Sequence, residues 1–296
     1  MSSEIFQAQL LGGGSDDGTP KGSKFFDATT VNELIVKPVI EQSVAMQVST
    51  VLRPTAGARV EIPLILNDGD GEPGWVPAGG EVPLNAAPDA GFLLLDHHKL
   101  AARGEVPWEH MDDVAHDVTN IYGQGLVNKL IRTIDDAFFS PAGKHPIHGV
   151  GKLKGINEMT ATGLANTDTF LDALEHAENH DTKVTSFVMS PATKTAIAKL
   201  KKATGSEENL LGVNDAPGSN TISGVPLLST RRVPDNIIWA LPADRLVVSM
   251  RQNATLTLDR TAGFERMTAG LLASTRVGMG CIEPAAVTKI TIDAAA

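Results

Sequence analysis

The stretch from Asp112 to Phe138 carries the longest helical pattern in the chain, and it constrains the fold more than any other segment. Its apolar residues recur at helical spacing and form one stripe, made of Val114, Val118, Ile121, Leu126, Leu130, Ile131, Ile134 and Phe138. An aspartate at its start can cap the first turn, and Ser140-Pro141 ends the pattern. At 1.5 Å per residue such a helix would be roughly 40 Å long. We therefore expect one long helix, with extended segments attached on both sides.

The composition favours turns and strands in the rest of the chain. Only 4% of the 296 residues are aromatic, whereas 28 are Gly and 17 are Pro. The net charge of −10 argues against nonspecific binding to phosphate backbones, although an acidic protein can still enclose nucleic acid. The single cysteine, Cys281, excludes an internal disulfide. No apolar run reaches the roughly 18 residues of a membrane span, so we expect a soluble intracellular protein.

Two segments of the first hundred residues cannot form a core of their own. Residues 1–30 include a Gly/Ser/Asp run and predict an arm that orders only against a neighbour. Asn67–Gly91 is rich in Gly and Pro, and the strand patterns of residues 60–66 and 91–101 flank it. Together they predict a two-stranded arm, which is only marginally stable in water and needs another surface to lie on.

The rest of the chain predicts an α+β fold. Alternation also predicts a strand from Ala45 to Ile65, interrupted at Arg53-Pro54. Ser190 is expected to cap a helix that starts at Pro191. The predicted helices are 168–176 and 191–203, and the predicted strands are 184–189, 222–228, 237–241, 246–250, 254–258, 267–281 and 287–292.

The sequence offers only weak candidates for metal chemistry. Asp96-His97-His98 resembles a metal-binding triplet, but alternate residues of a strand face opposite sides. His176 and His180, with Glu178 between them, have helical spacing for zinc but no third ligand in the sequence pattern. Surface polar residues explain both groups more simply. Asp68, Asp70 and Glu72 could bind calcium, but their spacing departs from the EF-hand pattern. A hydrophilic loop tip is the simpler interpretation.

Catalytic motifs are weaker still. Gly149, Gly151 and Gly155 in GVGKLKG lack the lysine spacing of a phosphate loop, so we interpret them as a turn. No serine lies in a Gly-x-Ser-x-Gly elbow, and Cys281 on an apolar strand is interpreted as a core residue. We therefore predict no enzyme, no catalytic residue, no metal site and no cofactor.

Five segments follow one another along the chain: GWVPAGGEVP with FLLLDHHKLAARGEVPWEHMDD, IDDAFFSPAGKHPIHGV, SFVMSPATKTAIAKLKKATGSEENLLG, ISGVPLLSTRRVPDN and ERMTAGLLASTRVGMGCIEPAAVTKI. In this order they resemble the major capsid proteins of tailed bacteriophages with the HK97 fold, and the resemblance covers nearly everything after the arm. The resemblance implies an HK97-like α+β capsid fold. The parts it implies are an N-terminal arm (1–30), an extended loop (49–95), a peripheral domain (96–155) with a spine helix (112–138), an axial domain (156–250), long strands of the peripheral domain (251–284) and a C-terminal strand that returns to the axial domain (285–296).

The function implied by the resemblance is structural. The chain would self-assemble into pentamers and hexamers of an icosahedral head that encloses double-stranded DNA without binding a specific sequence. It would assemble in the bacterial host cytoplasm with a portal. Since the N-terminus carries no scaffold segment, either a separate scaffolding protein guides assembly or this is the form left after cleavage, and the initial Met1 favours the separate scaffolding protein. Use of a decoration protein is left open. The expected contact residues between subunits are Trp75, Glu81, Asp68, Asp70, Glu72, Glu207, Glu208, Phe6 and Phe25.

Departures from the family lead to two further expectations. Some relatives join a loop lysine to an asparagine of a neighbour with the help of a glutamate, but residues 49–95 contain no lysine here. Met267 and Ser274 stand where the asparagine and glutamate would be, so we predict no covalent crosslink. The negative charge predicts an inner face that is neutral or acidic apart from scattered residues such as Lys21 and Lys24, because a basic lining would adsorb the packed DNA.

Two alternatives remain at this point. An encapsulin-like compartment shell would use the same architecture but would hold enzyme cargo. A metal-dependent hydrolase would use Asp96, His98, His176 and His180, and it would contain stoichiometric metal.

Overall fold

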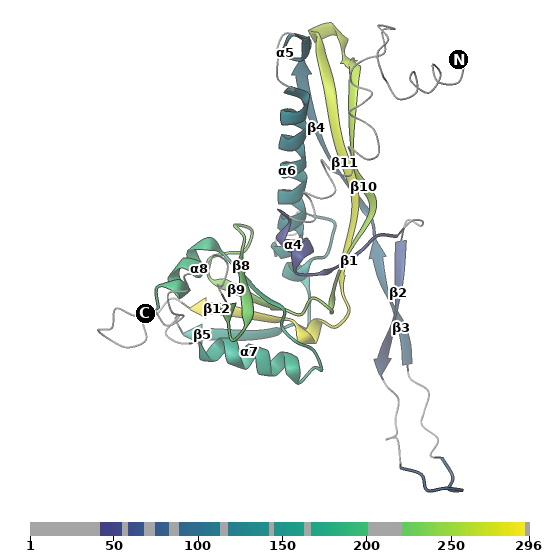
Figure 1. Ribbon diagram of the computed structural model, residues 1–296, viewed down its shortest axis with the longest axis vertical. Coiled ribbons are helices and arrows are strands. Elements are labelled where there is room, and N and C mark those ends of the chain that lie inside the picture. The colour runs from purple at the N-terminus through teal and green to yellow at the C-terminus, as the bar shows by residue number, and fades with distance from the viewer. Residues whose placement is uncertain are drawn as a thin grey trace, which may run out of the picture. The chain divides into compact units, whose positions relative to one another are not determined.

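The computed structural model describes residues 42–54, 59–67, 75–82, 89–112, 118–141, 145–162, 167–200 and 221–293 (Figure 1). These residues form two compact units. The first unit contains the described residues within 42–43, 99–134 and 252–276, and the second contains those within 44–98, 135–251 and 277–293. Neither unit is a continuous segment, because the chain passes from one to the other several times.

The first unit is a helix packed on long strands. Helix α6 (Val118–Phe139) belongs to this unit up to residue 134. It lies along β4 (His98–Pro107), β10 (Leu246–Gly263) and β11 (Thr268–Cys281) (Figure 1). The neighbour order of these strands is β10-β11-β4. A Cβ added at Gly123 would lie 3.0 Å from Leu256 Cδ2, and one added at Gly104 would lie 3.6 Å from Leu126 Cδ2. Glycine at these two positions therefore lets the helix and strands approach closely.

The long helix is confirmed, but its expected bounds and stripe need correction. A short helix, α5 (Trp108–Asp112), precedes α6, and residues 113–117 lie outside the described part of the chain. Ile121 does not belong to the buried stripe, because its side chain is 64% exposed. Nine residues at about 100° each place Ile121 on the opposite side of the helix from the buried Leu130.

The core of the second unit is a six-stranded mixed sheet with the order β5-β12-β9-β6-β8-β7. Strand β12 pairs parallel with β5 and antiparallel with β9, and β6 pairs antiparallel with β9 and parallel with β8. The bounds are β5 Asn157–Thr162, β6 Ser186–Met189, β7 Thr221–Ile222, β8 Val225–Ser229, β9 Ile237–Leu241 and β12 Thr288–Asp293.

Two helices contribute to one apolar cluster with this sheet. Helix α7 (Asp168–Glu178) supplies Phe170, whose ring meets that of Phe187 of β6 edge to face at 5.1 Å. Helix α8 (Pro191–Ala198) supplies Ile197. As expected, the Ser190 side chain caps α8 and accepts a hydrogen bond from the Thr193 backbone N–H at 3.1 Å.

The remaining elements of the second unit lie near the start of β10. Helix α4 (Val44–Gln47) and strand β1 (Thr50–Leu52) follow each other, and β1 pairs parallel with β10 from Thr50↔Val247 onward. Strands β2 (Arg59–Asn67) and β3 (Asp89–Asp96) form a separate two-stranded sheet.

Four expectations for local structure were wrong. The strand expected from Ala45 begins as helix α4, because the Asp135 carboxylate accepts from the first backbone N–H groups of that helix. The strands expected at 246–250 and 254–258 are one strand, β10, which has β11 as a neighbour in the sheet. Helix α8 ends at Ala198 rather than 203. Strand β5 was not expected at all, since its sequence NEMTAT has no clear apolar alternation.

Candidate assembly interface

The β2–β3 hairpin has two apolar faces. Its antiparallel register pairs Val60 with Leu95, Ile62 with Leu93 and Pro63 with Phe92. Side chains alternate between the faces of a strand, so Val60, Ile62, Leu93 and Leu95 share one face. Pro63, Ile65, Phe92 and Leu94 share the other face, where Glu61 is the charged residue opposite Leu94. A two-stranded sheet with apolar residues on both faces needs cover on both faces.

The first face is anchored inside the second unit. Leu95 is completely buried, and a Cβ added at Gly280 of β11 would lie 2.4 Å from Leu95 Cδ2 and 3.2 Å from Leu93 Cδ2. At the same end of the hairpin the Arg59 guanidinium binds the Asp96 carboxylate at 2.5 Å. The base of the hairpin is therefore fixed by close packing against β11.

The second face has no such cover within the described residues. The side chains of Ile65 and Phe92 are each 66% exposed, and that of Leu94 is 50% exposed. Exposed contiguous apolar residues of this kind are typical of protein–protein contact surfaces. This face is the strongest candidate for contact with another molecule.

The expected contact residues fall mainly outside the described part of the chain. Phe6, Phe25, Asp68, Asp70, Glu72, Glu207 and Glu208 all do so. Trp75 and Glu81 are described, and both are exposed. Between them, the Gly80 N–H donates to the Pro77 carbonyl at 2.9 Å, and Gly79 has the positive φ of 82° that glycine adopts without strain. The turn thus presents Trp75 and Glu81 to solvent.

A second exposed apolar group lies in the first unit, at the turn from β10 to β11. Phe264 and Met267 are mostly exposed there, and Phe264 meets the Trp108 ring edge to face at 6.4 Å. Met267 has a left-handed φ of 50°, and its carbonyl accepts from the Trp108 backbone N–H at 2.9 Å.

The positions relevant to a covalent crosslink hold no suitable chemistry. Met267 carries a thioether in this turn, and the buried Ser274 hydroxyl lies 3.1 Å from Thr255 Oγ1. Neither side chain has the amide or the carboxylate that joining to a lysine would use. The expected absence of a crosslink remains a prediction for the assembled particle.

Two of the candidate metal residues, Asp96 and His180, have other polar partners. The hydrogen bond from Arg59 lowers the pKa of Asp96, and the neighbouring His97 Nε2 lies 2.8 Å from Ser249 Oγ. The His176 and His180 rings are tilted to each other with centroids 5.0 Å apart, and His180 Nδ1 lies 3.0 Å from Glu283 Oε1. Across the described residues, no three His, Cys, Asp or Glu side chains gather in a group that could hold a metal ion. The geometry therefore does not support the hydrolase hypothesis.

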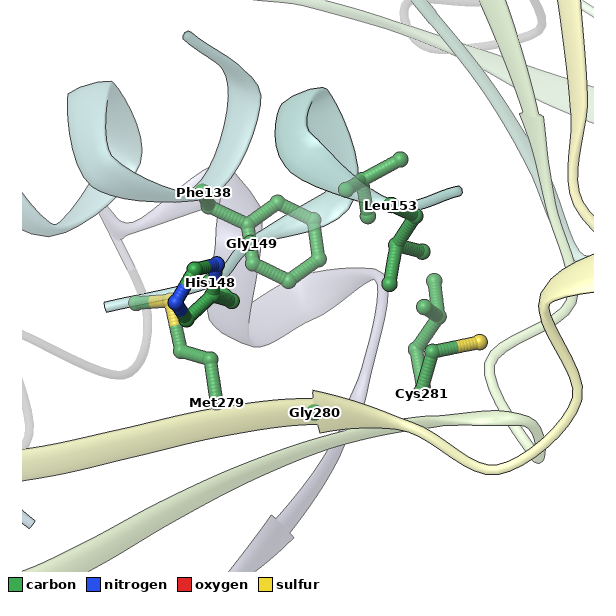
Figure 2. A pocket seen from close by; sticks show the side chains of 9 residues that line it. Phe138, His148, Gly149, Leu153, Met279, Gly280 and Cys281 are labelled. Carbon is green, nitrogen blue, oxygen red and sulfur yellow. The ribbon is translucent and has the colours of Figure 1, made fainter. Parts of the chain in front are cut away.

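Gly149 and Gly151 let their segment pack closely against the end of α6. A Cβ at Gly149 would lie 2.3 Å from Phe138 Cα, and one at Gly151 would lie 2.4 Å from the Phe139 carbonyl oxygen. Figure 2 shows Phe138, His148, Leu153, Met279 and Cys281 around the space beside this contact, which does not admit a water molecule. The segment is a tight packing element, in agreement with its interpretation as a turn.

Cys281 is the core residue that the sequence indicated. Its side chain is buried, and burial raises the pKa of the thiol to about 12. A thiol that stays protonated at neutral pH is a poor nucleophile and a poor metal ligand.

The residues of the exposed hairpin face were missed by sequence reasoning. Their signal is present in the sequence, because FLLL at 92–95 and IPLIL at 62–66 are apolar at consecutive positions rather than at alternate ones. Such runs indicate strands that are covered on both faces. In a two-stranded arm, the second cover has to come from elsewhere.

One protein family matches most of the sequence. The sequence matches the family described as "Phage capsid family" over residues 27–292. Described residues include no helix long and apolar enough to cross a membrane. None of the curated proteins matches the sequence.

Solved structures share the fold at low sequence identity. A structure described as the capsid of an empty GTA particle is 19% identical, covers 84% of this chain and 89% of its own, and has a TM-score of 0.66. A structure from Microbacterium phage Oxtober96 is 17% identical, covers 85% and 91%, and has a TM-score of 0.68. One from Mycobacterium phage Adephagia is 14% identical, covers 85% and 90%, and has a TM-score of 0.64.

Proposed function

Because the chain belongs to the phage capsid family and is a major capsid protein with the HK97-like fold that forms an icosahedral head, we propose that the β2–β3 hairpin of each copy packs on the body of the adjacent copy. Repetition of this head-to-tail contact closes rings of five and six subunits, since a heterologous contact forms a ring when its rotation closes.

The observation that carries this proposal is the exposed apolar face of a hairpin whose other face is anchored. Full burial of a Phe or Leu side chain stabilises a contact by about 1.5–3 kcal/mol. Phe92 and Leu94 together could therefore contribute several kcal/mol at each interface, and every subunit in the shell repeats the contact. Trp75 and Glu81 extend the same contact on the exposed turn.

Assembly of a double variant, Phe92→Ser with Leu94→Ser, tests the proposal. Both side chains are largely exposed in the single chain, so we expect an unchanged circular dichroism spectrum and thermal unfolding of the subunit. We expect no rings or shells in sedimentation velocity and negative-stain microscopy at concentrations where the wild type assembles.

Leu171→Ser is the matched control, because Leu171 is 48% exposed on α7 and lies outside the hairpin. This variant should assemble as the wild type does. Normal assembly of the double variant, or equal loss of assembly in the control, would overturn the proposed role of the hairpin.

The same function includes partners that the subunit meets during head formation. We infer that it assembles in the bacterial host cytoplasm with a separate scaffolding protein and a portal, and that the finished head encloses double-stranded DNA. The net charge of −10 supports an inner face that does not adsorb phosphates. A contiguous basic lining of the shell interior, seen by electron microscopy, would contradict this part of the proposal.

A further inference from the structure

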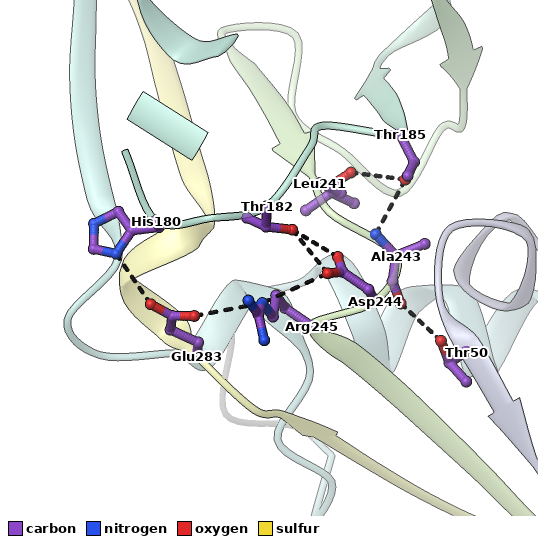
Figure 3. A network of polar contacts seen from close by, with 9 residues as sticks. All are labelled: Thr50, His180, Thr182, Thr185, Leu241, Ala243, Asp244, Arg245 and Glu283. Atoms are coloured by element: carbon purple, nitrogen blue, oxygen red, sulfur yellow. Dashed lines mark hydrogen bonds and ion pairs between the residues drawn. The ribbon is translucent and has the colours of Figure 1, made fainter. Parts of the chain in front are cut away.

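A closed circuit of polar contacts surrounds the end of α7 in the second unit (Figure 3). His180 Nδ1 lies 3.0 Å from Glu283 Oε1, and the other oxygen of Glu283 lies 3.4 Å from Arg245 Nε. Arg245 Nε lies 3.6 Å from Asp244 Oδ2, and the Asp244 carboxylate accepts from Thr182 Oγ1 at 2.8 and 2.9 Å. The two ends of the circuit, His180 and Thr182, therefore lie on one short segment after α7.

This circuit joins three parts of the unit that are far apart in the sequence. They are the end of α7, the turn from β9 to β10 and the connection from β11 to β12. The Ile282 N–H also donates to the Arg245 carbonyl at 2.8 Å, so the turn and the connection are linked through the backbone as well. Because both Arg245 distances exceed the usual hydrogen-bond range, charge rather than a normal hydrogen bond holds that guanidinium.

His176 and His180, whose rings are in tilted contact, differ in their surroundings. The His180 ring has the Glu283 carboxylate beside it, whereas the buried His176 Nδ1 has no hydrogen-bond partner among the described residues. Burial, and then the neighbouring His180, lower the pKa of His176. A proton on His176 Nδ1 would therefore bury a charged donor that has no acceptor among the described residues.

Further charged groups lie on α7 itself and on the strand beside it. Asp172, Glu175 and Glu178 lie on the exposed side of the helix, and Asp181 follows its end. On the neighbouring strand β12, the Lys289 ammonium binds Glu158 of β5 at 3.0 Å. The circuit itself holds Glu283, Asp244 and Arg245 in contact with one another.

We propose that this circuit is an acid-sensitive latch, in which the contact of neutral His176 with the His180 ring holds the end of α7 against the β9–β10 turn and the β11–β12 connection, and protonation of His176 opens it. The charged His176 ring leaves this contact for solvent, where the exposed carboxylates of α7 lie. The departure loosens His180, and Glu283 then keeps only its contact with Arg245. The latch goes beyond the shell contact proposed above and does not depend on it.

Hydrogen exchange of the full-length protein tests the latch directly. Labelling times are scaled so that intrinsic exchange stays equal between about pH 7.5 and about pH 5, the range in which histidines titrate. We expect exchange of peptides covering residues 177–185 and 282–287 to be clearly faster at the lower pH than at the higher pH. Peptides from β6 and β9 should not change.

Two variants and a control separate the latch from general acid sensitivity. His176→Leu keeps an apolar contact of similar size but removes the titrating group. Exchange of the same peptides in this variant should therefore stay slow at both pH values. Glu283→Gln weakens the contacts that hold His180 and Arg245, so the latch is less stable and should begin to open at a higher pH. His110→Gln, which removes an exposed histidine of the other unit, should behave as the wild type.

Either of two results would overturn the proposal. One is a wild type whose exchange in these peptides does not respond to pH. The other is an acid response that persists in His176→Leu. If His176→Leu fails to fold, the shift of the opening midpoint in Glu283→Gln decides the question, and an unshifted midpoint refutes the latch.

Discussion

Leu95 of the hairpin and Gly280 of β11 lie so close that a single methyl group at Gly280 would approach Leu95 Cδ2 to 2.4 Å. Leu95 is fully buried and cannot move aside at low cost. This contact fixes the base of an arm whose other face we propose to contact a neighbouring copy. The proposed assembly contact therefore depends on packing within the subunit.

Gly280→Ala is expected to destabilise the subunit by about 1–3 kcal/mol, because it overpacks a filled core. Thermal and denaturant unfolding of the unassembled protein measure this change. Gly125→Ala is the control, since a Cβ there meets nothing within 4 Å and alanine is favoured over glycine in a helix by up to about 1 kcal/mol. Equal stability of the two variants would contradict the close contact at Gly280.

Asp135→Ala should cost about 1–3 kcal/mol, because it leaves buried backbone N–H groups without an acceptor. The Asp135 side chain is buried, and its carboxylate accepts from the Ala45 N–H at 3.0 Å and from the Val44 N–H at 3.4 Å. Asp135→Asn retains an acceptor oxygen and should lose less. The order wild type, Asn, Ala in urea midpoint checks the prediction, and an Ala variant as stable as the wild type would refute it.

Local signals in the sequence were sufficient for several elements and insufficient for others. The start of α8 follows from Ser190-Pro191 alone, because capping is decided within one turn of the helix. Helix α4 has four residues, and its N-terminal N–H groups are satisfied by Asp135, about 90 positions away. No window of the sequence around residue 44 contains that partner. Strand β5 likewise depends on pairing with β12, which follows it by more than 120 residues.

The candidate interface was predictable in outline only. The sequence indicated a two-stranded arm that needs a second surface, and the structure describes that hairpin as β2 and β3. Which face is free depends on the contact of Leu95 with Gly280, which joins residues on distant strands. For this reason Phe92 and Leu94 could not be separated from Leu93 and Leu95 by pattern alone.

Mature particles boiled in denaturant should run as one band near 31.2 kDa, the mass of the single chain. Residues 49–95 hold no lysine, and positions 267 and 274 hold Met and Ser, so the groups that would form a bond between subunits are missing at these places. Denaturing electrophoresis without a reducing agent checks this directly. A ladder of multimers that survives boiling would show that another set of residues forms a covalent link.

Native Cys281 should react with iodoacetamide far more slowly than the same residue in denaturant. Alkylation requires the thiolate, and burial raises the pKa of this thiol from 9.0 to about 12, which lowers the thiolate fraction at pH 8 by roughly a thousandfold. A raised pKa in the folded state also means that the protonated thiol stabilises the fold below pH 9.0 and that this contribution is lost as pH rises from 9.0 toward 12. Cys281→Ala should therefore lose less stability than the wild type over that alkaline range in urea unfolding. Labelling of the native wild type at the rate seen in denaturant would show that the thiol is accessible and would contradict its place in the core.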